Sequence, residues 1–237
     1  MEYFMDVVFV IDVSKSMTEY LDVVKQRLYT FLPDLNKAFA AAGRSHSDCR
    51  AKIIAFRNYS VDKDSAMQTS PFFILRSSNV DNQNECLKFK NYVNSLDAHG
   101  GDFDRNNALE ALSIAIKNEW SQECLKRRHY IVLFTSCGAC KLEDSSKKLE
   151  NYYPLGMPHS LAELTNLWMA PQNHWICGKW SRLNQPSKRL LMFAPQVYPW
   201  PELYESWDQV VYNPSKAGEG IDDAYIDDIV NAIVASV

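Results

Sequence analysis

Short runs of apolar residues alternate along the chain with longer segments in which apolar residues recur every three or four positions. The runs are rich in β-branched and aromatic residues, which predicts strands. They cover 4–11, 51–56, 129–135 and 189–194, with two shorter strands at 72–75, a candidate antiparallel edge, and 209–212. Polar connections are expected at 43–49 and 62–70.

The three-and-four spacing predicts amphipathic helices between these strands. They cover 17–35, 84–96, 106–120, 144–152, 161–169, a short helix opening at Pro199–Pro201, and 221–237. Pro33 is expected to kink or break the first helix near its end.

Alternating strands and helices predict an α/β fold, in which a doubly wound, mostly parallel sheet is flanked by helices on both faces. The sequence shows no repeat and no Gly/Ser linker, so we expect a single domain over 1–237. Extended loops are predicted at about 136–158 and 171–187. Ligands of such sheets bind beyond the carboxyl ends of the strands, so the loops after 11, 56, 101 and 135 are the candidates for a site.

The amino-acid composition narrows the classes of function that this chain could have. The chain has 237 residues, 46% of them hydrophobic, and a formal net charge of −4. Nucleic-acid binding is not indicated, because such proteins usually carry a basic excess. One basic cluster, 126–129, is interpreted as a solvated helix end. No apolar stretch approaches the ~20 residues of a membrane span and no signal peptide is visible, so we expect a cytoplasmic protein with reduced thiols.

The loop after the first strand carries the pattern D-x-S-x-S, formed by Asp12, Ser14 and Ser16. Alternation lets these three side chains converge, and a carboxylate with two hydroxyls suits Mg²⁺ or Mn²⁺. A structural alternative is a capping box, with Ser16 as the N-cap and Glu19 three positions later.

Four segments in order resemble von Willebrand factor A domains, above all their bacterial tellurite-resistance-associated branch. The first is VVFVIDVSKSM, which is similar to the family's opening signature. The others are HGGD followed by NALEAL, then RHYIVLFTSCGA, and finally KRLLMFAPQVYPW with AGEGI before the last helix. The resemblance spans nearly the whole chain.

The resemblance implies a metal-ion-dependent adhesion site in three loops. Asp12, Ser14 and Ser16 match its first loop fully. In the second loop Asp102 or Asp104 could supply an oxygen, although both could equally be turn and N-cap residues before the helix at Asn106.

The third loop departs from the family, because Ser136 stands where the family has an aspartate. Losing such a supporting carboxylate weakens metal affinity by ~10–100-fold in other proteins. We therefore hypothesise a degenerate site whose partner binding is partly or wholly independent of Mg²⁺ or Mn²⁺.

A C-x-x-C pair, Cys137 and Cys140, directly follows the 129–135 strand. A thioredoxin-type redox site has this local setting. A zinc site would need further ligands such as Cys177, His159 or His174, and inert reduced thiols are the third interpretation. No nucleotide-binding glycine loop, zinc-protease motif or serine-hydrolase elbow is present.

The sequence thus predicts a non-enzymatic protein–protein interaction module that binds on its loop face. In the family, an acidic side chain of the partner completes the metal's coordination, and related bacterial domains accompany stress or defence systems. Trp175 and Trp180 are candidate exposed contacts. The alternatives are a thiol redox or zinc protein using Cys137 and Cys140, and a structural subunit with a vestigial metal site.

Overall fold

The computed structural model describes most of the chain. The described residues are 2–43, 45–75, 80–122, 126–144, 153–176, 179–215, 230–231 and 233. Among them no helix combines the length and the apolar character needed to cross a membrane.

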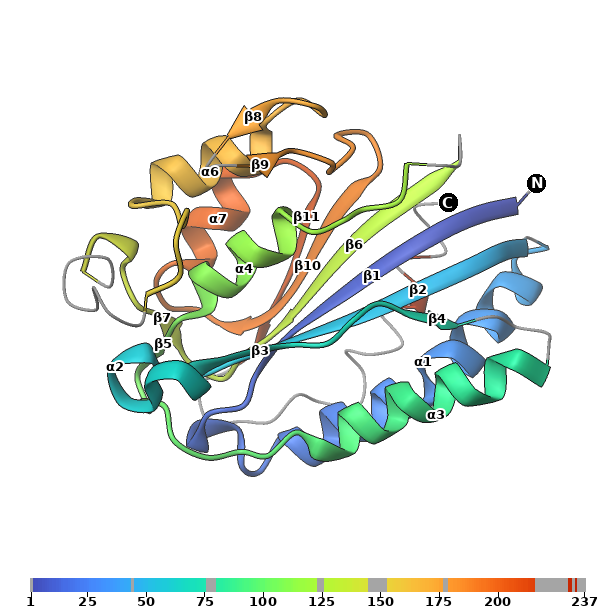
Figure 1. The fold of residues 1–237 in the computed structure, drawn as a ribbon, viewed down its shortest axis with the longest axis horizontal. Coiled ribbons are helices and arrows are strands. Elements are labelled where there is room, and N and C mark those ends of the chain that lie inside the picture. Colours follow the sequence, from blue (N-terminus) through green and yellow to red (C-terminus); the bar gives the residue numbers. More distant parts are fainter. Residues whose placement is uncertain are drawn as a thin grey trace.

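Seven described strands form one mixed sheet in the order β11–β10–β6–β1–β2–β3, with β4 also paired to β2 (Figure 1). All neighbours from β11 to β2 are parallel, whereas β3 and β4 run antiparallel to β2. The strands are β1 Glu2–Asp12, β2 Ser45–Phe56, β3 Met67–Thr69, β4 Phe73–Leu75, β6 Arg127–Phe134, β10 Lys188–Pro195 and β11 Val210–Ser215.

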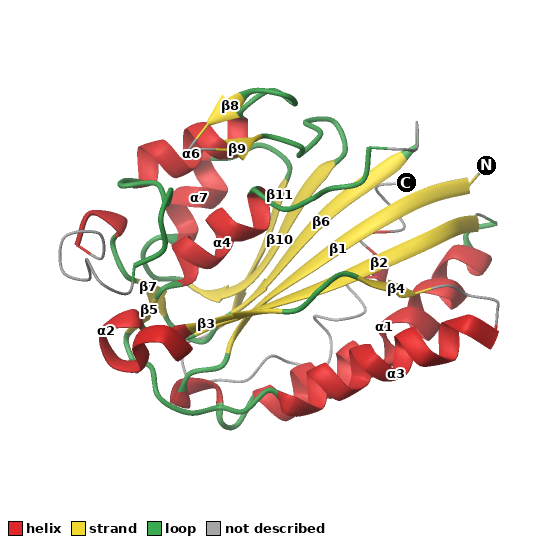
Figure 2. Ribbon diagram, in the orientation of Figure 1, coloured by secondary structure: helices red, strands yellow, loops and turns green. Residues whose placement is uncertain are grey.

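Helices cover both faces of this sheet (Figure 2). Val7, Phe9 and Ile11 of β1 pack with α1 (Leu21–Ala41) and α3 (Val80–Ser95). The alternate residues Val8 and Val10 pack with the helices of the other face. Those helices are α4 Ala108–Ile116, α6 Leu161–Met169 and α7 Trp200–Ser206. The predicted α/β class with a mostly parallel sheet is therefore confirmed, as is the antiparallel edge at 72–75.

Several short elements connect the layers. They are η1 Lys15–Met17, α2 Tyr59–Asp62, η2 Lys63–Ala66, β5 Arg105–Asn106, β7 Gly138–Ala139, β8 Trp175–Ile176 and β9 Lys179–Trp180. Of the two predicted loops, 136–158 contains β7 and 171–187 contains the β8–β9 hairpin.

Four boundary predictions were wrong because tertiary pairing overrides local pattern. The polar residues 45–49 belong to β2, where they pair with the start of β1, and the expected turn at 62–70 holds η2 and β3. The cluster 126–129 is no helix end, since residues 127–129 lie in β6 against β1. The helix predicted at 106–120 spans only Ala108–Ile116.

Pro33 does not end the first helix. Helix α1 continues eight residues further, to Ala41. Leu35 and Phe39, beyond the proline, are buried in the core, and this packing offsets the backbone hydrogen bond that proline removes.

Two predicted helices fall largely outside the described residues. Residue 144 is the only described part of the helix predicted at 144–152, and residues 230, 231 and 233, all helical, are the described part of that at 221–237.

Candidate binding site at the carboxyl ends of β1 and β6

The strand order reverses between β1 and β6, and side chains from both strand ends meet there. In open α/β sheets such a reversal leaves a crevice beyond the carboxyl ends of the strands. Asp12 is the last residue of β1, and Thr135 directly follows β6. Both are buried, so the candidate site has a closed, polar floor.

The first loop brings its three predicted residues together. The backbone N–H of Ser14 donates to Asp12 Oδ1 over 2.9 Å, and the hydroxyls of Ser14 and Ser16 lie 2.9 Å apart. The Ser136 hydroxyl donates to Ser16 Oγ, also over 2.9 Å. Ser16 lies inside η1, whose N-cap is Ser14, so the capping-box alternative is wrong.

The second loop contributes a residue that the sequence reasoning missed. Asp102 and Asp104 are exposed, and Asp102 Oδ1 accepts from the Asp104 N–H over 3.0 Å. Neither is the N-cap of α4, which is Asn107. The buried side chain facing the first loop is Asn106, whose Nδ2 lies 2.9 Å from Ser14 Oγ and 3.4 Å from Asp12 Oδ2.

The third loop adds two further donors to the same carboxylate. The Thr135 hydroxyl donates to Asp12 Oδ2 over 2.8 Å, and the Cys137 thiol donates to it over 3.3 Å. Burial raises the pKa of Asp12 above its usual value, and the hydrogen bonds from Ser14, Thr135 and Cys137 offset only part of that rise. Burial and the neighbouring Asp12 charge raise the pKa of Cys137, which keeps its thiol protonated and able to donate.

The second cysteine of the C-x-x-C pair occupies a different setting. Cys140 is partly exposed, and its Sγ lies 3.6 Å from Asn58 Nδ2 and 3.7 Å from the carbonyl oxygen of Arg105. Burial and the nearby Glu110 charge raise the pKa of Cys140 to about 12. A redox site needs an accessible thiolate, so the burial of Cys137 and the raised pKa values of both thiols disfavour that chemistry.

The described residues contain no cluster of metal-ligating side chains that would support the zinc hypothesis. No group of three or more His, Cys, Asp or Glu side chains able to hold a metal occurs among them. His159 and His174 are exposed, and Cys177 lies outside the described residues.

Close approach of two loops fixes the site's upper rim. Gly101 has a φ of +68°, and a Cβ on it would lie 2.3 Å from the Cβ of Ser14, so only glycine fits. Its N–H donates to Asp62 Oδ2 over 2.8 Å.

The Arg57 side chain connects the same loops by hydrogen bonds to their backbone carbonyls. Its Nε donates to the carbonyl oxygens of Val13 and His99, at 3.1 and 3.0 Å. Its Nη1 and Nη2 donate to the carbonyl oxygens of Ser65 and Asp97, at 3.0 and 2.9 Å.

An open groove of about 460 Å³ lies at the mouth of the site. Phe103, 66% exposed, stands on its rim, and Lys15 Nζ lies 5.8 Å from the centroid of that ring. Its lining residues come from the first, second and third loops: Lys15, Ser16, Thr18, Glu19, Tyr20, Phe103 and Ser136. The groove therefore combines one cation, one carboxylate, hydroxyls and an aromatic surface.

The donor set in the floor does not fit Mg²⁺ or Mn²⁺ as it is arranged. These ions need oxygen ligands with free lone pairs. Asp12 Oδ2 instead receives three hydrogen bonds, and the amide Nδ2 of Asn106 faces Ser14 Oγ.

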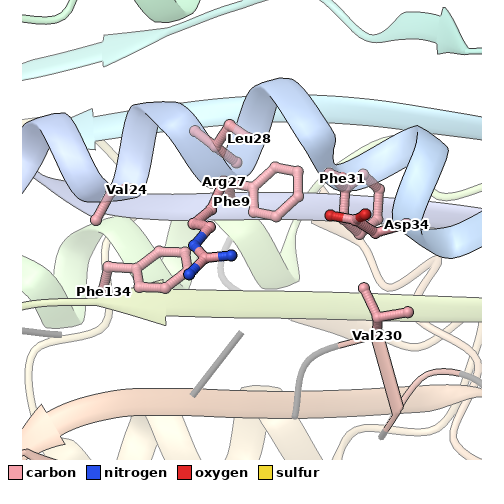
Figure 3. A pocket seen from close by; sticks show the side chains of 8 residues that line it. All are labelled: Phe9, Val24, Arg27, Leu28, Phe31, Asp34, Phe134 and Val230. Atoms are coloured by element: carbon pink, nitrogen blue, oxygen red, sulfur yellow. The ribbon is translucent and has the colours of Figure 1, made fainter. Parts of the chain in front are cut away.

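A second, smaller pocket lies under α1, away from the loops. Figure 3 shows side chains of α1 gathered with Phe9 of β1 and Phe134 of β6 around this pocket, with Arg27 and Asp34 as its polar members. The lining residues are Phe9, Val24, Arg27, Leu28, Phe31, Asp34, Phe134 and Val230. This pocket belongs to the core between sheet and helix and carries no catalytic grouping.

Of the two tryptophans predicted as contacts, Trp175 is exposed, on β8. It lies in the 171–187 loop rather than in the three loops of the site. The side chain of Trp180 lies outside what the structure describes.

No protein-family model matches the sequence, and no curated protein does. Among solved structures, proximal thread matrix protein 1 from the mussel byssus is similar at 11% identity, covering 99% of this chain and 48% of that one, with a TM-score of 0.48. The pilus adhesin SpaC from Lactobacillus rhamnosus GG is similar at 12% identity, covering 97% and 30%, with a TM-score of 0.49. The chain thus spans less than half the length of either, and likeness at this level says nothing about function.

Proposed function

We propose that the chain is a von Willebrand A-type module that binds a protein partner on its loop face and turns over no substrate. The loop face comprises residues 12–16, 99–106 and 136–140. Numbered along the chain, the main strands follow the order 3-2-1-4-5-6 of doubly wound folds, with the β3/β4 edge as the third. This order, and a D-x-S-x-S loop at the reversal point, support the assignment.

The observation that carries the proposal is the exposed Phe103 beside Lys15 at the mouth of the groove. Exposed aromatic residues flanked by polar groups are typical of interface hot spots. An acidic side chain of the partner would meet the Lys15 ammonium and the hydroxyls of Ser16 and Ser136, while Phe103 buries apolar surface.

Partner binding on this face is proposed to be independent of Mg²⁺ or Mn²⁺. Lys15 supplies the positive charge that an acidic side chain needs, and it lies at the surface, where the side chain can reach it. The contact is then charge-assisted rather than metal-bridged, and salt screens it.

Site-specific photo-crosslinking tests the face directly. A photoreactive phenylalanine analogue replaces Phe103 in one sample and Leu87 in another, in the source cells. Leu87 is 56% exposed on α3, so it is a matched exposed apolar position away from the loops. We expect a discrete adduct from position 103 only, formed equally with and without a chelator of divalent cations.

Loss of that adduct in Lys15→Glu, with an unchanged melting temperature, would assign the acidic contact. Equal labelling at both positions, or none at position 103, would contradict the binding face and favour the vestigial structural subunit. An adduct abolished by the chelator would contradict metal independence alone.

A further inference from the structure

The Asp12 carboxylate accepts hydrogen bonds from four donors of its own chain. Its Oδ1 accepts from the Ser14 N–H, and its Oδ2 accepts from Thr135, Cys137 and Asn106 at 2.8, 3.3 and 3.4 Å. An ionised carboxylate offers about four lone-pair sites. Four donors face the carboxylate, three at Oδ2 and one at Oδ1, and each of them is an uncharged group.

Asn106 occupies the centre of this arrangement. Its Nδ2 lies 2.9 Å from Ser14 Oγ, 3.1 Å from the carbonyl oxygen of Asp102 and 3.2 Å from Cys137 Sγ. With Asp12 Oδ2 at 3.4 Å, four electron-rich atoms from all three loops surround a single amide nitrogen.

The orientation of the amide is dictated by the backbone. Asn106 Oδ1 accepts a hydrogen bond from the Asp102 N–H over 2.9 Å. A flipped carboxamide would set its NH₂ group against this N–H and turn its oxygen toward the Asp12 carboxylate, two unfavourable pairings in a buried place. The NH₂ group therefore points at Asp12 and Ser14.

We infer that the Asn106 carboxamide replaces a divalent cation in this site. Its NH₂ group supplies the electropositive centre that an ion would supply to Asp12 and Ser14, and it does so without a net charge. The Asn106 side chain is buried, and both its amide oxygen and its amide nitrogen are hydrogen-bonded. An ion could enter only by displacing this side chain. Asn106 is thus the residue that sets cation affinity here, and the native site does not take up Mg²⁺ or Mn²⁺.

Reversing the polarity of this one group should create an ion site. Asn106→Asp is isosteric, removes the NH₂ donor and places a second carboxylate opposite Asp12. Two facing carboxylates repel unless a proton or a cation lies between them. Ser136→Asp adds a third carboxylate at the third loop.

Titration with Mn²⁺, followed by electron paramagnetic resonance of the free ion and by thermal melting, tests the inference. We expect no saturable binding by the native protein up to about 1 mM Mn²⁺. Asn106→Asp, alone or with Ser136→Asp, should bind at least ~10-fold more tightly, and its melting temperature should rise with Mn²⁺. Asn173→Asp makes the same charge change in an exposed loop and should behave as the native protein.

Saturable binding of Mn²⁺ by the native protein below that concentration would overturn the inference. So would an Asn106→Asp protein that folds and binds no more tightly than the native one. If Asn106→Asp needs the ion to fold, recovery of the native circular-dichroism spectrum on adding Mn²⁺ supports the inference, and failure to recover contradicts it. Asn106→Thr with Ser136→Asp, which introduces less charge repulsion, repeats the binding measurement. No partner is involved, so this result is separate from that of the crosslinking.

Discussion

Strand β1 carries two fully buried aspartates, and the protein stabilises their carboxyl groups in different ways. Asp6 and Asp12 lie six residues apart on the same face of the sheet. Asp6 is held by a cation: Arg50 Nε and Nη2 each lie 2.7 Å from one of its carboxylate oxygens, and the Ser121 N–H donates over 2.7 Å. Asp12 is held by uncharged donors alone.

This difference distinguishes a contact that stabilises the fold, at Asp6, from one that is suited to ligand binding, at Asp12. The Arg50 fork at Asp6 gives short, charge-assisted bonds, and cutting it leaves a buried charge without its counter-charge. At Asp12 four weaker bonds share the task, so the loss of any one leaves three. We therefore expect the Asp6 end to dominate stability, and the Asp12 end to tolerate the changes of polarity on which a ligand site depends.

The largest effect should come from removing the cation at the Asp6 end. Arg50→Met should lower the free energy of unfolding by ~3–5 kcal/mol, because Asp6 stays buried without its counter-charge. Urea unfolding followed by circular dichroism measures this. In the double variant Asp6→Asn/Arg50→Met most of the loss should be recovered. A loss of less than ~1 kcal/mol in the single variant would remove the contrast between the two ends.

A second effect at the same end should depend on pH. His129, beside Asp6 in the register, stacks on Trp120 with ring centroids 4.9 Å apart, and burial lowers its pKa to about 3. The unfolded chain takes up this proton near pH 6.5 while the folded one does not. Stability should therefore be unaffected by this group above pH 6.5 and fall as pH decreases toward 3, by up to ~1.4 kcal/mol per unit.

Urea unfolding of native protein and His129→Asn between pH 4 and 8 isolates that slope. The variant should show a shallower decline below pH 6.5. The exposed His159→Asn serves as the control and should retain the native slope. Parallel curves for all three proteins would show that His129 titrates normally in the folded state.

The smallest effect should appear at the Asp12 end. Thr135→Val removes one of the four donors with little change of shape, and we expect a loss of ~1–2 kcal/mol. Thr69→Val, on the exposed part of β3, should stay within ~0.5 kcal/mol of the native protein. If Thr135→Val lowered the free energy of unfolding as much as Arg50→Met, the four donors at Asp12 would not contribute comparably to stabilising the carboxylate.

The sequence predicted the framework well and the site only in part. Apolar runs identified the core strands because burial on both faces demands them. The hydrophobic pattern missed the strand at 45–49, because these polar residues form a strand only by pairing with β1. D-x-S-x-S signalled the convergence of the first loop, since alternation is a local property. The aspartates predicted for the second loop point to solvent instead.

The remaining donors at Asp12 could not be predicted from local pattern. Asn106, Thr135 and Cys137 lie 94 to 125 positions from Asp12 in the sequence. Each has an ordinary local explanation, as a helix start, a strand end or half of a C-x-x-C pair. The one available signal was Asn106 itself, a polar residue next to the apolar NALEAL helix in a loop expected to reach the strand ends.

Arg57 has a consequence for how tightly this face can hold a partner. One rigid, planar guanidinium joins the end of β1, the turn at Ser65 and the segment 97–99 through their backbone carbonyls. Loops joined in this way are immobilised before any encounter, so little conformational entropy remains to be lost on association. Gly101 also packs closely against Ser14, so a displacement of the Gly100–Gly101 rim is transmitted to the first loop, and these two loops respond to a ligand together.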